Sequence, residues 1–291
     1  MLTIFAIPKA FRGHMATIQR NAITSWMLLR PQPEILLFGG EEGTAEIAQE
    51  LGARHLPEVA RNDLGTPLLH DLFAQAEHQA SNDLLCYVNS DIILLNDFAR
   101  AVERVNAWQP RFLMVGQRWD VNITKPWDFG RTDWPEQLKA CALRSNNQQP
   151  PNAIDYFVFS RGLGSDILPL AIGRRCWDNW LVWHARALGA AVVNVTPVVM
   201  AIHQNHDYSH HPQGADGVFR GEEARRNREL IGEWWHLYTM EDATHELTPE
   251  GFRPLRRHGW LMVKRTFSHP RSWPRLAGLL LARPFGRAPA K

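Results

Sequence analysis

One acidic residue, Asp91, follows a buried strand in a position where a carboxylate can hold a metal ion. It belongs to the segment YVNSDI at 87–92, where an apolar run ends in a short polar turn before apolar residues resume. Such a carboxylate binds Mg²⁺ or Mn²⁺, oxygen-seeking cations that bridge to phosphate groups. Asn-Ser-Asp is also ordinary turn chemistry, so a purely structural turn is the alternative interpretation.

Other polar residues adjoin further apolar runs and are candidates for substrate binding. Pro8 and Lys9 follow the first run, where the Lys9 ammonium could neutralise a phosphate. Arg118 and Asp120 follow a later run, at the rim where a second substrate would lie, and Asp155 opens the run DYFVFS. Solvated loop charges are the alternative interpretation for these side chains.

These candidates need a sheet whose strands end at one edge. The runs 2–7, 34–38 and 84–88 are almost wholly apolar, which is typical of parallel strands covered on both faces. Helical patterns alternate with them, at 15–29 and in a helix expected to open at Thr66. This alternation predicts an α/β fold with a doubly wound, mostly parallel sheet, whose ligands bind outside the carboxyl ends of the strands.

The second half of the chain is less regular. Residues 119–153, rich in Trp, Asn, Gln and Pro, are expected to be irregular, and residues 175–188 to form a helix. A polar loop with four histidines is expected at 203–214, followed by a helix at about 220–238. The G-x-G-x-x-G and G-x-x-x-x-G-K-[ST] motifs are missing from the sequence, so we expect neither a Rossmann dinucleotide enzyme nor a P-loop NTPase.

The amino-acid composition excludes several classes of protein. The chain has 291 residues, 45% of them hydrophobic and 21% charged, which excludes wholesale disorder and allows a sizeable core. Its three widely spaced cysteines give neither a disulfide framework nor a zinc knuckle. Because the N-terminus lacks a basic leader and no run reaches the ~20 apolar residues of a spanning helix, we expect a cytoplasmic protein.

Charge is unevenly distributed along the chain. Residues 251–291 carry ten Lys or Arg and no acid, so this segment is +10 and residues 1–250 are −8. Large apolar residues lie between the basic ones, which predicts a basic amphipathic helical tail that attaches peripherally to an anionic membrane surface. A basic helix packed on the acidic body is the alternative. Nucleic acid is not expected as a partner, because the tail has no recognisable binding fold.

The order of these segments resembles the GT-A class of nucleotide-sugar glycosyltransferases, especially its family-2-like members. Such enzymes begin with a strand for the nucleotide, continue with an N-x-G-x-x-x-A-like segment and reach a strand that ends in a metal-binding DXD motif. The corresponding pieces are IFAIPKAF at 4–11, NDLGTPLLHDLFAQA at 62–76 and YVNSDI, within a resemblance that covers about residues 1–215. Asn89 stands where the first DXD acid would be.

The resemblance implies a metal-dependent transferase that moves a sugar from a nucleotide-sugar donor to a glycan or lipid-linked acceptor. Residues 1–118 would form the nucleotide-sugar half of the domain, and residues 119–250 the acceptor and catalytic half. Asn62 and Asn89 would contact the donor, and Asp91 would hold Mn²⁺ or Mg²⁺.

In this class a late His or Asp often completes the metal site. The segment HQNHDYSHH offers His203, His206 and Asp207 for this role. His203 directly follows an apolar run and would lie at the end of a strand, and an imidazole suits Mn²⁺ better than Mg²⁺. A three-histidine zinc site and a solvated polar loop are the alternatives.

An inverting transfer also needs a base that takes the proton of the acceptor hydroxyl. Family-2-like enzymes place an acid for this at the start of a helix in the second half, and the matching acid here is Asp178, in GRRCWDNWLVW. The neighbouring Trp177 could stack on a sugar. Alternatively, Asp178 complements the helix dipole and the tryptophan belongs to the core.

Two other functions remain open on the sequence. A sugar-phosphate nucleotidyltransferase uses a related sheet, but usually has a glycine-rich basic loop after the first strand, and IPKAFRGH has one glycine. A non-catalytic protein that binds sugars or polyanions is the other alternative, which the replacement of the first DXD acid by Asn89 keeps open.

Overall fold

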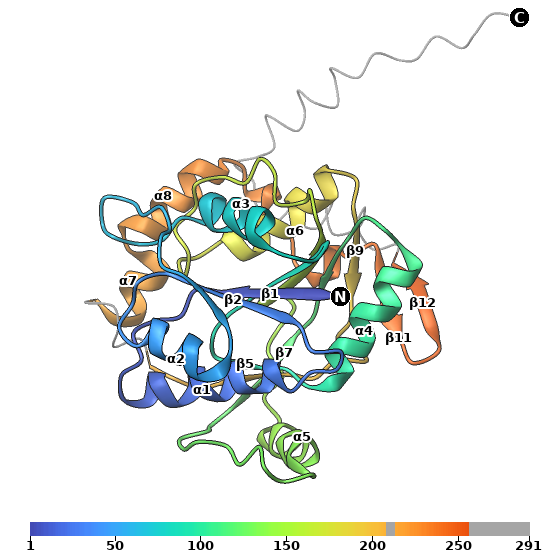
Figure 1. Cartoon of the computed structure of the whole chain (residues 1–291). Coiled ribbons are helices and arrows are strands. Elements are labelled where there is room, and N and C mark those ends of the chain that lie inside the picture. Colours follow the sequence, from blue (N-terminus) through green and yellow to red (C-terminus); the bar gives the residue numbers. More distant parts are fainter. Residues whose placement is uncertain (208–212, 256–291) are drawn as a thin grey trace, which may run out of the picture.

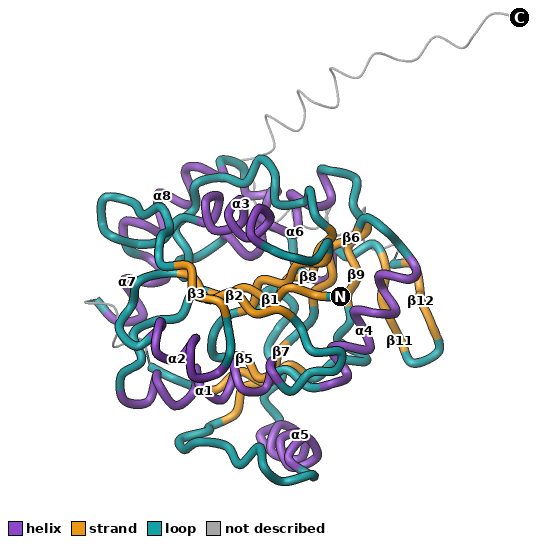
Figure 2. The backbone as a smooth tube through the Cα atoms, viewed as in Figure 1, coloured by secondary structure: helices purple, strands orange, loops and turns teal. Residues whose placement is uncertain are grey.

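A large β-sheet runs through the computed structural model, which describes residues 1–207 and 213–255 (Figures 1 and 2). The strands are β1 (Leu2–Ala6), β2 (Glu34–Phe38), β3 (Arg54–Leu56), β4 (Leu84–Val88), β5 (Ile92–Ile93), β6 (Phe112–Val115), β7 (Arg118–Val121), β8 (Tyr156–Ser160), β9 (Ala191–Asn194), β10 (Ala201–Gln204), β11 (His245–Thr248) and β12 (Gly251–Pro254). The helices are α1 (Gly13–Met27), α2 (Thr44–Leu51), α3 (Leu69–Gln79), α4 (Asn96–Trp108), α5 (Trp134–Ser145), α6 (Trp177–Ala187), α7 (Gly214–Arg220) and α8 (Glu222–Ile231), with short 3-10 helices at Trp234–His236 and Met240–Asp242.

The main sheet has nine strands in the order β12-β11-β9-β6-β8-β4-β1-β2-β3. Only β8 and β12 run against the others, since each pairs antiparallel with its neighbours. The mostly parallel α/β sheet predicted from the sequence is therefore confirmed. Because β8 is reversed, its amino end lies at the same edge of the sheet as the carboxyl ends of β4 and β6.

Helices cover both faces of this sheet (Figure 1). Side chains of β1 alternate between the two layers: Ile4 packs in the core that contains Trp26 of α1, whereas Phe5 packs in the core that contains Phe73 of α3 and Trp180 of α6. Burial on both sides explains why the parallel strands read as unbroken apolar runs.

A second, three-stranded sheet has the order β5-β10-β7 and lies beside α1 (Figure 2). β10 pairs antiparallel with β5 and parallel with β7. Its apolar side chains share a small core with α5, built around Ile93, Val121, Leu138 and Ile202. This sheet joins the segment that follows Asp91 to two distant parts of the chain.

Several elements differ from the sequence-based expectation. The expected irregular stretch 119–153 contains most of β7 and all of α5. The expected helix start at Thr66 was wrong, because Pro67 and Leu68 stay extended and form β-bridges, and α3 begins at Leu69. The expected polar loop at 203–214 begins inside β10.

The C-terminal expectations are also modified. The helix expected at 220–238 is interrupted at Gly232, which has φ 74° and ends α8. The tail expected from residue 251 begins instead with β12, which pairs with β11 in the main sheet. Residues 256–291 of that tail, like His210 and His211, lie outside the described residues.

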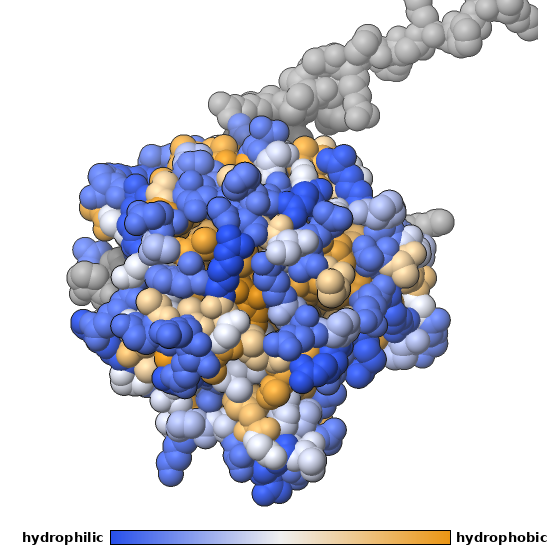
Figure 3. Space-filling model, viewed as in Figure 1, coloured by the Kyte–Doolittle hydropathy of each residue, from blue (hydrophilic) through white to orange (hydrophobic). Residues whose placement is uncertain are grey.

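On the face seen in Figure 3, hydrophilic side chains predominate, with apolar ones in small groups between them. Within residues 1–207 and 213–255, no helix is both long enough and apolar enough to cross a membrane.

Candidate functional site

A cleft of about 1380 Å³ opens at the edge where the parallel strands end. Its walls come from the segments after β1 and β4, the segment before β8, the start of α6, and α7 and α8. Ten of the eleven residues expected from the sequence to form the site line this cleft: Pro8, Lys9, Asn89, Asp91, Arg118, Asp155, Trp177, Asp178, His203 and His206.

Asn62 is the residue that does not line the cleft. Its side-chain oxygen accepts hydrogen bonds from the backbone N–H groups of Leu64 and Thr66, at 3.0 and 2.9 Å. Its amide donates to Glu223 at 2.6 Å, so its side chain organises the loop before α3 and ties that loop to α8. A direct role in donor binding stays a prediction.

Asp91, His203 and His206 form a cluster that can hold a metal ion. One ligand atom from each lies within 4.8 Å of the other two. His206 Nε2 is 3.1 Å from Asp91 Oδ2, and His203 Nε2 is 3.7 Å from the same oxygen. The other carboxylate oxygen, Asp91 Oδ1, is buried and accepts no hydrogen bond from any described residue. An orphaned buried carboxylate oxygen beside two imidazoles fits a divalent cation such as Mn²⁺.

The three-stranded sheet explains how these distant residues meet. His203 of β10 pairs opposite Ile92 of β5, the residue directly after Asp91. On its other side His203 pairs with Asp120 of β7. Directly opposed residues on neighbouring strands bring their side chains to within about 5 Å of each other. The site is thus assembled by strand pairing.

The sequence places Asp120 with Arg118 at the rim where a second substrate would lie, but gives no sign that Asp120 meets the metal cluster. Its Oδ1 lies 3.1 Å from His203 Nδ1, while His203 Nε2 faces Asp91. A carboxylate on the far ring nitrogen is the usual way to orient a metal-binding imidazole. Burial disfavours protonation of His203, but the carboxylates of Asp91 and Asp120 outweigh it and raise its pKa.

The charge of the cluster keeps Asp91 ionised. Burial opposes ionisation of its carboxyl, but the neighbouring His203, His206 and Lys9 together hold its pKa well below the usual range. A permanently ionised carboxylate is the form that binds a cation.

Buried amides position the turn that carries Asp91. Gln204, fully buried, donates from its side chain to the backbone oxygen of Asp91 at 3.1 Å and to Ile18 of α1 at 2.7 Å. Asn21 of α1 donates to the Gln204 side chain at 2.9 Å. Gln19, two residues earlier on α1, holds the backbone of Lys9 through two hydrogen bonds. In the sequence Gln19 and Asn21 flank Arg20 in a polar run, and only the structure shows that both are buried.

A second group of charges lies next to the metal cluster. Arg118 donates to Asp120 at 2.9 Å and also to Asp155 Oδ2. The Asn89 amide donates to Asp155 Oδ1 at 2.6 Å, and Tyr87 donates to the Asn89 oxygen at 3.1 Å. Asn89 therefore holds Asp155 in place.

Asp178 lies at the start of α6 and faces the cleft. Burial, and to a smaller extent the negative charge of Asp155, raises the pKa of this carboxyl to about 7. Trp177 beside it is 4% exposed and packs edge-on against Tyr87, with 5.3 Å between ring centroids. Its ring thus belongs largely to the core, and sugar stacking on it stays a prediction.

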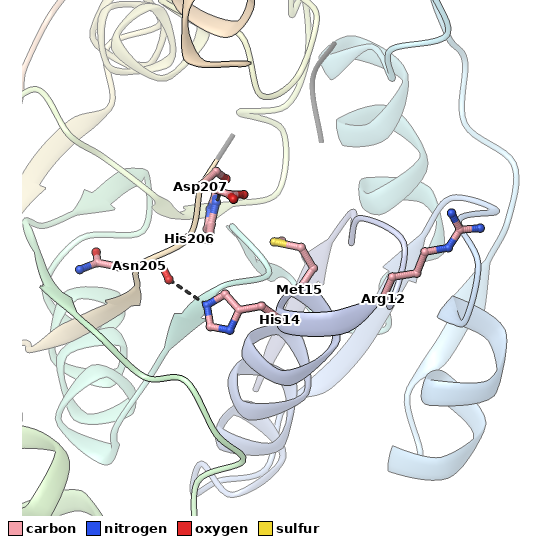
Figure 4. Close-up of a pocket in the computed structure, with 6 residues that line it drawn as sticks. All are labelled: Arg12, His14, Met15, Asn205, His206 and Asp207. Carbon is pink, nitrogen blue, oxygen red and sulfur yellow. Dashed lines mark hydrogen bonds between the residues drawn. The ribbon is translucent and has the colours of Figure 1, made fainter. Parts of the chain in front are cut away.

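A smaller pocket of about 480 Å³ adjoins the metal cluster (Figure 4). His206 and Asp207 extend from the segment after β10 and lie across from His14 and Met15, at the first turn of α1. His14 Nε2 is hydrogen-bonded to the backbone oxygen of Asn205 at 3.0 Å, which ties α1 to the segment carrying His206.

Comparisons with known proteins give distant similarities. Neither a family model nor a curated protein matches the sequence. Among solved structures, the chain is similar to glucosyl-3-phosphoglycerate synthase from Mycobacterium tuberculosis in complex with Mn²⁺, uridine diphosphate and phosphoglyceric acid. The two share 19% identity over 79% of this chain and 77% of that chain, with a TM-score of 0.48. It is also similar to residues 1–349 of S. aureus TarS, at 10% identity over 70% of this chain and 57% of that chain, with a TM-score of 0.43.

Proposed function

We propose that this protein is a metal-dependent glycosyltransferase that uses a nucleotide-sugar donor. The observation that carries the proposal is one cleft lined by three potential metal ligands and by a carboxyl group with a pKa of about 7. The order of sequence segments that resembles GT-A enzymes gives independent support. A carboxyl whose pKa is strongly raised inside a cleft is typical of functional sites and favours an enzyme over a non-catalytic binding protein.

The metal would be held by Asp91, His203 and His206. A divalent cation there neutralises the negative charge that builds on a departing nucleoside diphosphate. Lys9 lies close enough to this cluster for its charge to lower the pKa of Asp91, so its ammonium can reach a phosphate bound there. Pro8, Lys9 and Asn89 form the adjoining wall, which we assign to the donor.

Asp178 would act as the general base of an inverting transfer. A base with a pKa near the working pH combines an ionised population with enough basicity to take a proton from a hydroxyl. Asp155 and Arg118 lie close enough to Asp178 to influence its pKa in opposite directions. We assign these two residues to hydroxyl contacts with donor or acceptor.

The basic tail, which begins at residue 251, bears on where the enzyme would act. Its basic and apolar residues would hold the enzyme at the inner face of an anionic membrane, where a lipid-linked or envelope glycan could serve as acceptor. Each basic residue near such a surface contributes roughly 1 kcal/mol, so a handful suffices for reversible attachment.

A panel of nucleotide sugars, with and without Mn²⁺, tests the proposed function by thermal unfolding. A donor at 100 times its Kd adds about 2.7 kcal/mol to the free energy of unfolding. We expect a Mn²⁺-dependent rise in melting temperature for at least one donor, lost in Asp91→Ala. A flat response to every donor contradicts the proposal. With an active donor, the anomeric configuration of the product, read by NMR, tests inversion.

A further inference from the structure

Three arginines line one wall of the cleft and have no role in the site described so far. Arg175 precedes α6, and Arg225 and Arg228 belong to α8. Within the described parts of the chain, none of the three forms a salt bridge. Neighbouring arginines are paired, as Arg174 is with Glu223 and Arg226 with Asp63. Three guanidinium groups without carboxylate partners give this wall a net positive charge, although Glu229 of α8 also lines the cleft.

Arg228 carries the clearest sign of a missing partner. Its Nη1 is buried and makes no hydrogen bond to any described residue. A buried guanidinium N–H that is left unsatisfied costs stability, and a bound anion would satisfy it. Guanidinium groups match phosphate and carboxylate geometry because they donate two parallel hydrogen bonds.

The wall is held rigidly by a buried asparagine. Asn227 of α8 is 1% exposed, and it exchanges hydrogen bonds of 2.8 and 3.0 Å with the backbone of Ala171. Its amide also donates to the backbone oxygen of Arg175 at 3.3 Å. The clamp fixes Arg228, the next residue on α8, beside the segment that carries Arg175.

The same wall adjoins the proposed base. Burial raises the pKa of the Cys176 thiol, and the charge of Asp178 raises it further, while Arg175 and Arg228 lower it. All three charged groups therefore lie within electrostatic reach of Cys176, which directly precedes α6. By contrast, Lys9 and Asp91 influence each other's pKa on the metal side of the cleft.

We propose that Arg175, Arg225 and Arg228 bind a phosphate or carboxylate group of the acceptor and so present its hydroxyl to Asp178. The assignment to the acceptor rests on the proposed transferase function, whereas the binding of an anion by this wall does not. The rival assignment is that these arginines bind the diphosphate of the donor.

Titration of the full-length protein with inorganic phosphate, in EDTA and followed calorimetrically, tests anion binding. We expect the double variant Arg225→Gln, Arg228→Gln to bind phosphate at least about tenfold more weakly than the wild type. Arg226→Gln is the matched control, because Arg226 lies on the same helix but pairs with Asp63 and Glu222. If the double variant does not fold, Arg175→Gln tests the same loss of phosphate affinity, because Arg175 is an exposed side chain in a loop. Wild-type affinity in Arg175→Gln and in the folded double variant overturns the proposal.

A second titration separates acceptor from donor. Phosphate should still bind when the protein is saturated with uridine diphosphate and Mn²⁺. Displacement of phosphate by the nucleotide would assign the arginines to the donor and overturn the acceptor proposal.

Transfer assays then measure whether the arginines favour acceptors that carry an anionic group. With an active donor, the ratio of transfer to glycerol 3-phosphate over transfer to glycerol should fall at least about tenfold in the arginine variants. The same assay with phosphatidylglycerol vesicles as acceptor tests whether the anionic group is carried by a lipid or by a soluble acceptor. An unchanged ratio contradicts the proposal. Failure of the wild type to use any donor counts against the proposed function, while the phosphate titration still decides the anion site.

Discussion

The side-chain amide of Asn89 donates a hydrogen bond of 2.6 Å to Oδ1 of Asp155, across the paired strands β4 and β8. The backbone N–H of Asn89 also donates to the backbone oxygen of Asp155, at 2.9 Å. The other carboxylate oxygen of Asp155, Oδ2, forms a salt bridge with Arg118. An amide at position 89 is therefore a donor to a carboxylate, a role that an ionised acid cannot fill.

Asn89→Asp should weaken the fold, although it restores the acidic motif. The new carboxyl would face Asp155 at hydrogen-bond distance, so the pKa of the pair would rise. A carboxyl whose pKa is raised by folding stabilises the protein at low pH and loses that contribution as the pH rises. We expect a loss of about 1–3 kcal/mol in the free energy of unfolding at pH 8 and a smaller loss at pH 5.

Urea unfolding at the two pH values measures this difference. Asn122→Asp is the control, because the Asn122 oxygen is exposed and only accepts, from Asn205 at 2.6 Å. Tighter Mn²⁺ binding by Asn89→Asp without loss of stability would show that Asn89 is merely a weakened metal ligand.

Removal of Asp91 should abolish the metal site. Asp91→Ala and His206→Gln each take one ligand from the cluster, and we expect Mn²⁺ affinity to fall at least about tenfold. Electron paramagnetic resonance of free Mn²⁺ gives this affinity without any substrate. His78→Gln is the matched control, since His78 is an exposed residue of α3 that does not line the cleft. In an active assay Asp91→Asn should slow transfer at least about 100-fold, or about 2.7 kcal/mol of barrier. Unaltered Mn²⁺ binding in Asp91→Ala would refute the site.

Ionisation of Asp178 should raise the rate of transfer but lower the stability of the fold, so the two should change with pH in opposite directions. Its pKa of about 7 in the ligand-free protein predicts that kcat/KM rises with pH and levels off above about pH 7, as the base becomes ionised. Because folding raises this pKa, ionisation above it destabilises the native state. Asp178→Asn should therefore lose transfer, yet unfold about 2 °C or more above the wild type at pH 8 and close to it at pH 5.

The control for Asp178 is Asp83→Asn, at a side chain that is 95% exposed. Equal melting temperatures of Asp178→Asn and the wild type at both pH values would mean that the pKa of Asp178 is not raised. If Asp178→Asn kept full transferase activity, Asp178 would not be the base, and Asp155 would be the next candidate.

Much of the sheet and the site could be predicted because the relevant signals are local. Unbroken apolar runs mark β1, β2 and β4, since both faces of these strands are buried. Polar residues directly after such runs must gather at the carboxyl edge of a parallel sheet. Asp91, Lys9 and Arg118 were recognisable in this way, and the structure places all three around one cleft.

The rest depends on contacts between distant segments. β7 is four residues long and is stabilised by its pairing with β10, so its own sequence carries a weak strand signal. The strand β10, by contrast, is indicated by the apolar run before His203. Asp120 gains its role only because β10 brings His203 opposite it. Gln204 and Asn227 look like ordinary polar residues in the sequence, and their importance arises from burial among backbone groups that need partners.

The membrane proposal for the tail can be tested by truncating the chain just after β12. β12 ends at Pro254 and pairs with β11, so removal of residues 251–291 would break the main sheet. A chain ending at residue 255 keeps this hairpin and removes nine basic residues. In sedimentation with anionic vesicles at low salt, the full chain should pellet and the chain 1–255 should remain in solution, because the basic residues supply the attraction. Screening weakens such attraction, so 0.5 M salt should release the full chain. Equal behaviour of the two chains would exclude membrane attachment through the tail.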